Sequence, residues 1–265
     1  MGDRMTEEND GKPEVLTQDM VWAVAGQVNE LLEHYAQAVP EAKKVSSDTE
    51  KAIAKRLSVN GAKKFTTVRS LPFFFASELL TYLQRIQIYP FVAKYREVVK
   101  PSSADMNAAW QLHSHSLRQS ECYVIQERGT DMLEFAHSVA TDLGLGTKSR
   151  AKIFENRFKK HFATRLRDRH RVVHAHEKPS LTTRVTDLMV AADKKNPDEM
   201  NKQLMTMMFN VSQLLPGLPT DDPAEAIKRM FAMREEYPKI AEREAVEMMD
   251  IFYDELVQTI SPPNK

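Results

Sequence analysis

Apolar residues recur at steps of three and four along most of this 265-residue chain, which is the spacing of an amphipathic α-helix. Thr17 is the expected N-cap of the first helix, and Ser47 that of a second, short helix through residue 57. Asn60-Gly61 is expected to end the second helix, because both residues favour helix C-termini. The apolar stripe of the first helix consists of Val24, Val28, Leu31, Leu32 and Tyr35.

The middle of the chain predicts two longer helices. Ser70 and Pro72 mark the start of one, which Pro90 is expected to end or kink. Residues 104–142 form a longer helical stretch that Gly144 and Gly146 are expected to terminate. Its stripe consists of Met132, Phe135, Ala136, Val139 and Leu143.

Towards the C-terminus, Asn196-Pro197 and Asp222-Pro223 are expected to begin helices, and Pro238 to separate the second of these from a last helix. The longest alternating, strand-like pattern is residues 121–126. We therefore predict an all-α, multi-helix bundle: a flexible tail at residues 1–15 and a single helical domain at residues 16–265.

Composition narrows the class of protein. The formal net charge is zero, so a polyanionic partner would have to be bound by a local basic patch. The single cysteine, Cys122, excludes an intramolecular disulfide framework and fits a reducing compartment. No apolar run is long enough to span a bilayer. We expect a soluble, cytoplasmic protein without a membrane partner.

Residues 148–178 form a strongly basic run. Eleven Lys and Arg face three acidic residues there, a formal charge of +8, and four of the eight histidines fall in the same run. Such a segment concentrates positive potential where a phosphate backbone could bind. The alternative is a solvated helix face paired with acidic neighbours. Candidate phosphate-binding residues are Lys159, Lys160, Arg165, Arg167, Arg171 and His176.

Within this run, residues 169–174 read Arg-His-Arg-Val-Val-His. An arginine, a polar residue, three further residues and a histidine resemble the signature of the HEPN superfamily, and the helical setting near residues 104–195 is similar as well. An ideal helix would place Arg169 and His174 about 140° apart around its axis, so they converge only if the helix ends or bends nearby. Pro179 favours such an end. The alternative is an arginine and a histidine that only decorate a helix end.

The resemblance implies a metal-independent endoribonuclease that leaves a 2′,3′-cyclic phosphate. It implies that His174 moves protons, that Arg169 neutralises charge on the phosphorane and that His170 orients the site. It also implies a homodimer, RNA as the partner, and a role in phage defence or a toxin–antitoxin pair with a protein antitoxin or regulator. The alternative that it leaves open is a non-catalytic helical module that binds RNA or protein and dimerises.

No cofactor is expected. His170 and His174 stand at metal-ligand spacing, but the neighbouring arginines would repel a cation and no thiolate lies nearby in the sequence. The chain also lacks a glycine-rich phosphate loop and a dinucleotide fingerprint.

Overall fold

The computed structural model of the chain describes residues 15–57, 59–91, 104–167, 206, 209–210, 213 and 221–261. Within these residues the regular structure is helical, and the β-type pairing is one isolated bridge between Lys44 and Thr67. The all-α bundle is therefore confirmed. Its elements are α1 (Gln18–Gln37), α2 (Ser47–Arg56), α3 (Val59–Ala62), η1 (Val68–Ser70), α4 (Leu71–Ile88), α6 (Ala104–Asp142), α7 (Ala151–His161) and α11 (Pro223–Ile260).

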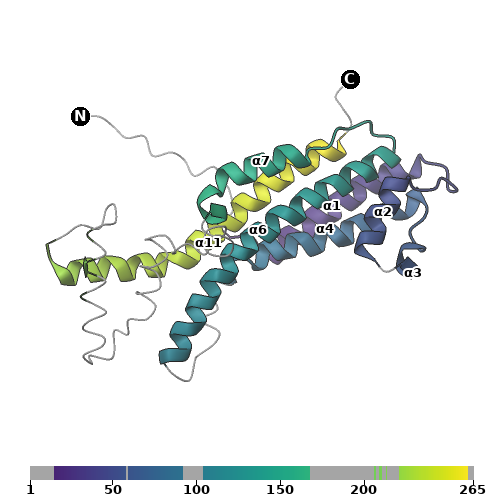
Figure 1. Cartoon of the computed structure of the whole chain (residues 1–265). Helices are drawn as coiled ribbons and strands as arrows, with labels where there is room; N and C mark the ends of the chain where they lie inside the picture. Colours follow the sequence, from purple (N-terminus) through teal and green to yellow (C-terminus); the bar gives the residue numbers. More distant parts are fainter. Residues whose placement is uncertain are drawn as a thin grey trace, which may run out of the picture.

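Helix α6 is the central element of the bundle. Its second half contacts α2, α4, α7 and α11, while α1 packs on α4 (Figure 1). Helix α11 runs beside both α6 and α7, so the C-terminal part of the chain closes the bundle. The first halves of α6 and α11 extend beyond the other helices (Figure 1). No helix in the described ranges is both long and apolar enough to cross a membrane.

Several helix ends lie where the sequence predicts them. Thr17 caps α1 by accepting a hydrogen bond from the backbone N–H of Met20, 3.3 Å away. At the end of α6, Gly144 adopts a φ of 81°, a left-handed conformation that glycine takes without strain. The N–H of Leu145 then donates to the carbonyl of Ala140 at 2.9 Å, which is the closing bond of a Schellman motif.

The boundaries of α2 differ from the prediction. Its N-cap is Ser46, whose Oγ accepts from the N–H of Thr49 at 3.4 Å, so the expected cap at Ser47 is wrong by one residue. The helix ends at Arg56 because Leu57 turns to an extended conformation. Asn60 and Gly61 lie in the separate helix α3 instead of ending α2.

The prediction that Pro238 separates two helices is wrong. Helix α11 is continuous from Pro223 to Ile260 with Pro238 inside it. A proline removes one backbone hydrogen bond and crowds the preceding turn, but it does not prevent helical dihedral angles after it. The turns beyond Pro238 bury an apolar stripe, and this burial offsets the lost bond. The stripe consists of Ala241, Ala245, Met248, Met249, Phe252 and Leu256.

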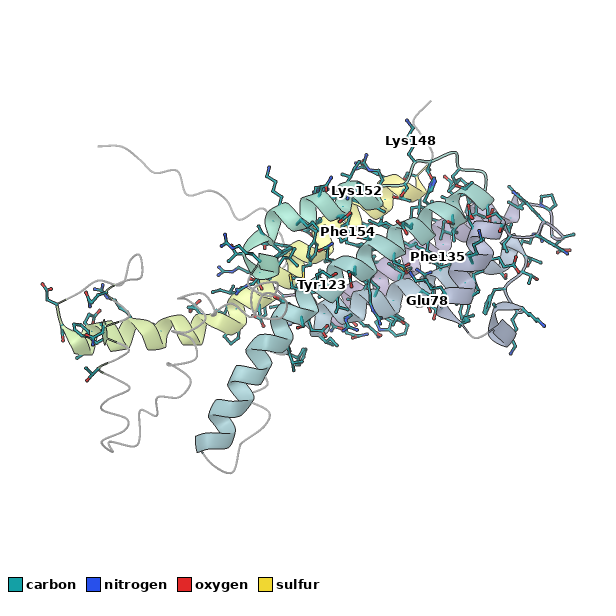
Figure 2. All side chains as sticks on the ribbon, in the orientation of Figure 1. Glu78, Tyr123, Phe135, Lys148, Lys152 and Phe154 are labelled. Carbon is teal, nitrogen blue, oxygen red and sulfur yellow. The ribbon has the colours of Figure 1, made fainter. Side chains whose placement is uncertain are left out.

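Aromatic side chains fill the core where α4, α6, α7 and α11 meet. Phe135 of α6 lies 5.4 Å from Phe75, and Phe252 of α11 lies 4.5 Å from Tyr82, both measured between ring centroids. Phe154 of α7 meets the same Phe252 ring edge to face at 5.9 Å. Phe135 and Phe154 both lie inside the bundle in Figure 2. This packing fixes α7, which leads into the candidate motif.

Candidate functional site

The predicted catalytic residues Arg169, His170 and His174 lie outside the described residues, as do Arg171 and His176. The helix start expected at Asn196-Pro197 lies outside them too. The structure does describe the chain up to Arg167, two residues before the motif. It therefore places four of the predicted phosphate-binding residues, namely Lys159, Lys160, Arg165 and Arg167.

Helix α7 (Ala151–His161) covers only the first part of the basic run at residues 148–178. It buries Ala151, Phe154 and Phe158 at helical spacing against the bundle. It ends at His161, and Phe162, itself buried, leaves the regular α-helical angles at φ −99° and ψ 26°. Residues 163–167 are helical again. The segment that leads to the motif thus consists of α7, a break at Phe162 and a short helical continuation.

The inner side of α7 is paired with a buried carboxylate of α11. Glu255 is 1% exposed and accepts a hydrogen bond from Nε of Arg150 at 2.8 Å. Its other oxygen accepts from Arg157, which also donates to Asp254 at 3.0 Å. The hydrogen bond to Glu255 is the main cause that raises the pKa of Arg157 further above its ordinary value. These arginines hold α7 on α11. Their positive charge is therefore neutralised by carboxylates of the same protein.

Arg165, four residues before Arg169 in the sequence, is also paired with a carboxylate of α11. Its Nε donates to Oε1 of Glu244 at 2.9 Å, and the hydroxyl of Tyr89 donates to Oε2 of the same carboxylate at 2.8 Å. The side chain of Arg165 is 23% exposed and that of Glu244 is 12% exposed. A phosphate would therefore have to compete with Glu244 for the Nε of Arg165.

Lys159 is paired within α7. Its Nζ donates to Glu155, which also accepts from Lys152 at 2.7 Å. These two hydrogen bonds, that from Lys152 first, lower the pKa of Glu155. Lys152 lies on the outer side of α7 in Figure 2 and its side chain is 75% exposed. Because both lysines are exposed, at 75% and 53%, water screens these two ion pairs and they contribute little to stability.

Two of the predicted phosphate-binding residues, unlike Lys159 and Arg165, have no acidic partner among the described residues. Lys160 and Arg167 are exposed, and neither forms an ion pair with a carboxylate in the part of the chain that the structure describes. They are seven residues apart, with the break at Phe162 between them. These two cations can take an external anion without losing a described internal partner.

Sequence reasoning missed a charged groove of about 800 Å³ between α2, α4, α6 and α7. At its floor, the Arg56 guanidinium lies 4.4 Å from the centroid of the Phe135 ring and pairs with Asp131 and with Glu78, the latter at 3.6 Å. The pKa of Glu78 is raised, mainly by burial of its carboxyl, which acts against the lowering by Arg56 and Arg128. Of the predicted site residues that are described, Lys159 alone lines this groove. Nothing local in the sequence marks these side chains, because they come from four separate helices.

A metal site is not formed by the described part of the chain, where no group of three or more His, Cys, Asp and Glu side chains is placed to hold an ion. Comparison with protein-family models, with curated proteins and with solved structures finds no match to this chain.

Proposed function

We propose that this protein is a metal-independent endoribonuclease of the HEPN type, with Arg169 and His174 as its catalytic residues. One observation carries the proposal. The Arg-polar-x3-His motif comes two residues after Arg167, which is exposed and without a described acidic partner, as is Lys160 before it. The motif thus follows directly on cations that are available for a phosphate backbone, in a protein whose fold is all-α as the resemblance requires.

The proposed reaction is an intramolecular transesterification of RNA. A base removes the proton of the ribose 2′-hydroxyl, and the oxygen attacks the adjacent phosphorus. The bond to the 5′-oxygen of the next nucleotide breaks, and that oxygen takes a proton from an acid. The products are a 2′,3′-cyclic phosphate and a 5′-hydroxyl. His174 would be the base or the acid, Arg169 would neutralise charge on the phosphorane oxygens, and His170 would orient the site by hydrogen bonding.

A homodimer would supply both proton-transfer roles, because two copies of His174 facing one cleft can divide the roles of base and acid. We propose this dimer, RNA as the partner and a role in phage defence or in a toxin–antitoxin pair as parts of the same hypothesis. The cytoplasm is the compartment in which such a substrate would be met.

Binding of the RNA backbone is assigned first to Lys160 and Arg167, together with Arg171 and His176 of the motif region. Lys159 and Arg165 would contribute by exchanging partners. Lys159, whose own side chain is 53% exposed, would leave Glu155, which costs little because water reaches the ammonium group. Arg165 would leave the more buried Glu244, which costs more.

The test is cleavage of structured and single-stranded RNA in the presence of EDTA. The wild-type protein is compared with Arg169→Ala, with His174→Ala and with His161→Ala as a matched control. His161 lies in the same basic run but pairs with Glu247 of α11 at 3.0 Å. We expect cyclic phosphate ends from the wild type and the control, and a loss of at least about a hundredfold in either motif variant.

Two outcomes would contradict the nuclease. One is cleavage that persists in both motif variants, and the other is no cleavage of any RNA by the wild type. Salt-sensitive RNA binding without cleavage would favour the alternative, a non-catalytic binding module. The pairing of Arg150, Arg157 and Arg165 with α11 assigns much of the basic charge to packing, so it lowers the charge available for RNA under either function.

A further inference from the structure

The charged groove beside α6 contains a buried polar side chain that the protein leaves without a partner. Gln126 lines this groove and is 4% exposed, and its Oε1 accepts no hydrogen bond in the part of the chain that the structure describes. Buried amide oxygens almost always have a partner in folded proteins. A half-turn of the terminal amide exchanges its oxygen and nitrogen, so either atom can be turned toward a ligand. Gln126 therefore points to a molecule that enters the groove from outside.

Glu78 of α4 is a second acceptor of the groove with capacity to spare. Its side chain is 31% exposed, and Nε of Arg56 lies 3.6 Å from its carboxylate, which is too long for a hydrogen bond. Arg56 instead donates to the carbonyl of Ala52 at 2.9 Å and to the carboxylate of Asp131. Burial raises the pKa of Glu78, so a further positive charge beside it would stabilise its ionised form.

Three carboxylates follow one another along the face of α6 that lines the groove. Glu127, Asp131 and Glu134 stand at i, i+4 and i+7, which places them on one side of a continuous helix. Lys55 and Arg56 neutralise Asp131, the middle one. Glu127 and Glu134 are exposed, lie about 10 Å apart along the helix axis, and form no ion pair with a described lysine or arginine. Negative charge thus remains at two points of this face.

The cations of the groove are mostly engaged with its carboxylates. Lys55, Arg56 and Lys159 each form an ion pair with an acidic residue that lines the groove. Arg128 is exposed and has no ion pair among the described residues, although its charge opposes the rise in the pKa of Glu78. The groups left over are therefore mainly acceptors. Their complement is a positively charged molecule with several N–H donors.

We propose that this groove binds a linear oligoamine, a small molecule in which methylene chains join several ammonium groups. Ammonium groups about 10 Å apart would pair with Glu127 and Glu134, in keeping with the helical rise between these residues. An inner ammonium group would donate to Glu78 and to Gln126, which line the same groove from α4 and α6. Charge-assisted hydrogen bonds of this kind are stronger than neutral ones.

The remaining lining of the groove suits the methylene chains. Tyr123 and Met132 line it as well, and both offer apolar atoms beside the polar acceptors (Tyr123 and Glu78 are labelled in Figure 2). A metal ion would need its ligands gathered around one point. No group of three or more His, Cys, Asp and Glu side chains in the described ranges is placed in this way. An extended organic cation matches the spread of the acceptors better than a metal ion does.

The test is isothermal titration calorimetry of the protein with spermidine, a triamine, at low ionic strength and without RNA. We expect one spermidine to bind per chain, at least about tenfold more tightly than 1,3-diaminopropane or Mg²⁺. The diamine is too short to span Glu127 and Glu134, and Mg²⁺ has no N–H donors. Because no RNA is present, the result does not depend on the proposed ribonuclease activity, and either proposal can fail alone.

Five variants locate the site and give the sign of the ligand charge. Glu78→Gln and Gln126→Leu each remove one acceptor and should weaken spermidine binding by about tenfold. Glu134→Gln, at an exposed position where folding is not at risk, should weaken it by about threefold. Arg128→Gln removes a repelling charge and should strengthen binding by about threefold. Glu30→Gln is the control, because Glu30 is an exposed carboxylate of α1 outside the groove.

Four results would overturn the proposal. The first is no saturable binding of spermidine by the wild type. The second is equal affinity for spermidine and Mg²⁺, which would show only a loose counterion. The third is wild-type affinity in Glu78→Gln, Gln126→Leu and Glu134→Gln alike, which would place the amine elsewhere on the protein. The last is weaker binding in Arg128→Gln, which would mean that the groove takes an anion.

Discussion

Arg150 donates a hydrogen bond from Nε to Oε2 of Glu255, 2.8 Å away, and this carboxylate is almost completely buried. The two residues are 105 positions apart in the sequence, and Arg157 binds the other oxygen of the same carboxylate. The basic run at residues 148–178 has the composition of a polyanion-binding segment, but several of its arginines form ion pairs with α11. Its arginines position the helix that leads to the candidate motif, and they leave Lys160 and Arg167 for external contacts.

Replacement of Glu255 by glutamine should destabilise the protein. The neutral amide cannot match two guanidinium groups, and their hydrogen bonds to a charged partner are lost. Because Arg150 and Arg157 remain partly exposed, at 29% and 42%, water compensates some of the loss. We expect the free energy of unfolding to fall by about 2 kcal/mol in urea denaturation. Asp254→Asn is the control, since Asp254 is 55% exposed, and it should cost less than about 0.5 kcal/mol.

Substitution of two helical glycines by alanine should change stability in opposite directions, because the space around each glycine differs. A Cβ at Gly129 of α6 would collide with the hydroxyl of Tyr82 and would lie 2.6 Å from Cζ of Phe154. Gly129→Ala should therefore destabilise by about 1–2 kcal/mol, although alanine is the better helix former. Nothing lies within 4 Å of a Cβ built at Gly26 of α1, so Gly26→Ala should stabilise by about 0.5–1 kcal/mol. Thermal unfolding of both variants measures this. A stabilising Gly129→Ala would contradict the close helix contact.

The helices could be predicted because their signals are local. Thr17, the Asp222-Pro223 start and the Gly144 end each act on backbone groups within a few residues, and Asp222 indeed caps α11 through Ala224 at 2.9 Å. The helix end predicted at Pro238 was wrong because the free energy lost with one backbone hydrogen bond is outweighed by the burial of the turns that follow it. That burial depends on α4, α6 and α7, which no local pattern identifies as neighbours.

The partners of the basic run could be predicted only in part. Glu244, Glu247, Asp254 and Glu255 fall within one arc of a helix, which marks an acidic face on α11. That face complements α7, but the register between the two helices depends on aromatic packing around Phe252. Which cations are paired and which remain available therefore follows from the three-dimensional packing. The chemistry of Arg169 and His174 stays a prediction, since the motif lies outside the described residues.

Glu78 should make stability depend on pH. Burial raises its pKa above the ordinary value of 4.5, so the folded state holds this proton more tightly than the unfolded chain does. Ionisation of Glu78 therefore costs stability at neutral pH, and this cost disappears as the pH falls below the unfolded value. We expect Glu78→Gln to be more stable than the wild type by about 0.5 kcal/mol at pH 7 and to lose this advantage near pH 4.

Urea denaturation at the two pH values measures the difference between Glu78→Gln and the wild type. Glu134→Gln is the control, because Glu134 is exposed at the edge of the same groove and should change stability little. A Glu78→Gln variant that is less stable than the wild type at pH 7 would mean that the ion pair with Arg56 outweighs the burial of the carboxylate.

Lys160 and Arg167 should contribute more to RNA binding than the paired lysines of the same helix. Each phosphate contact with single-stranded RNA adds about 0.7 to the slope of log affinity against log salt. The double variant Lys160→Ala/Arg167→Ala should therefore lower that slope by about 1.4 and weaken binding at low salt. Lys152→Ala also removes an exposed cation, but one that already neutralises Glu155, so its slope should change less. Equal changes per charge removed would indicate that RNA senses only the overall charge, and the distinction between free and paired cations would then be wrong.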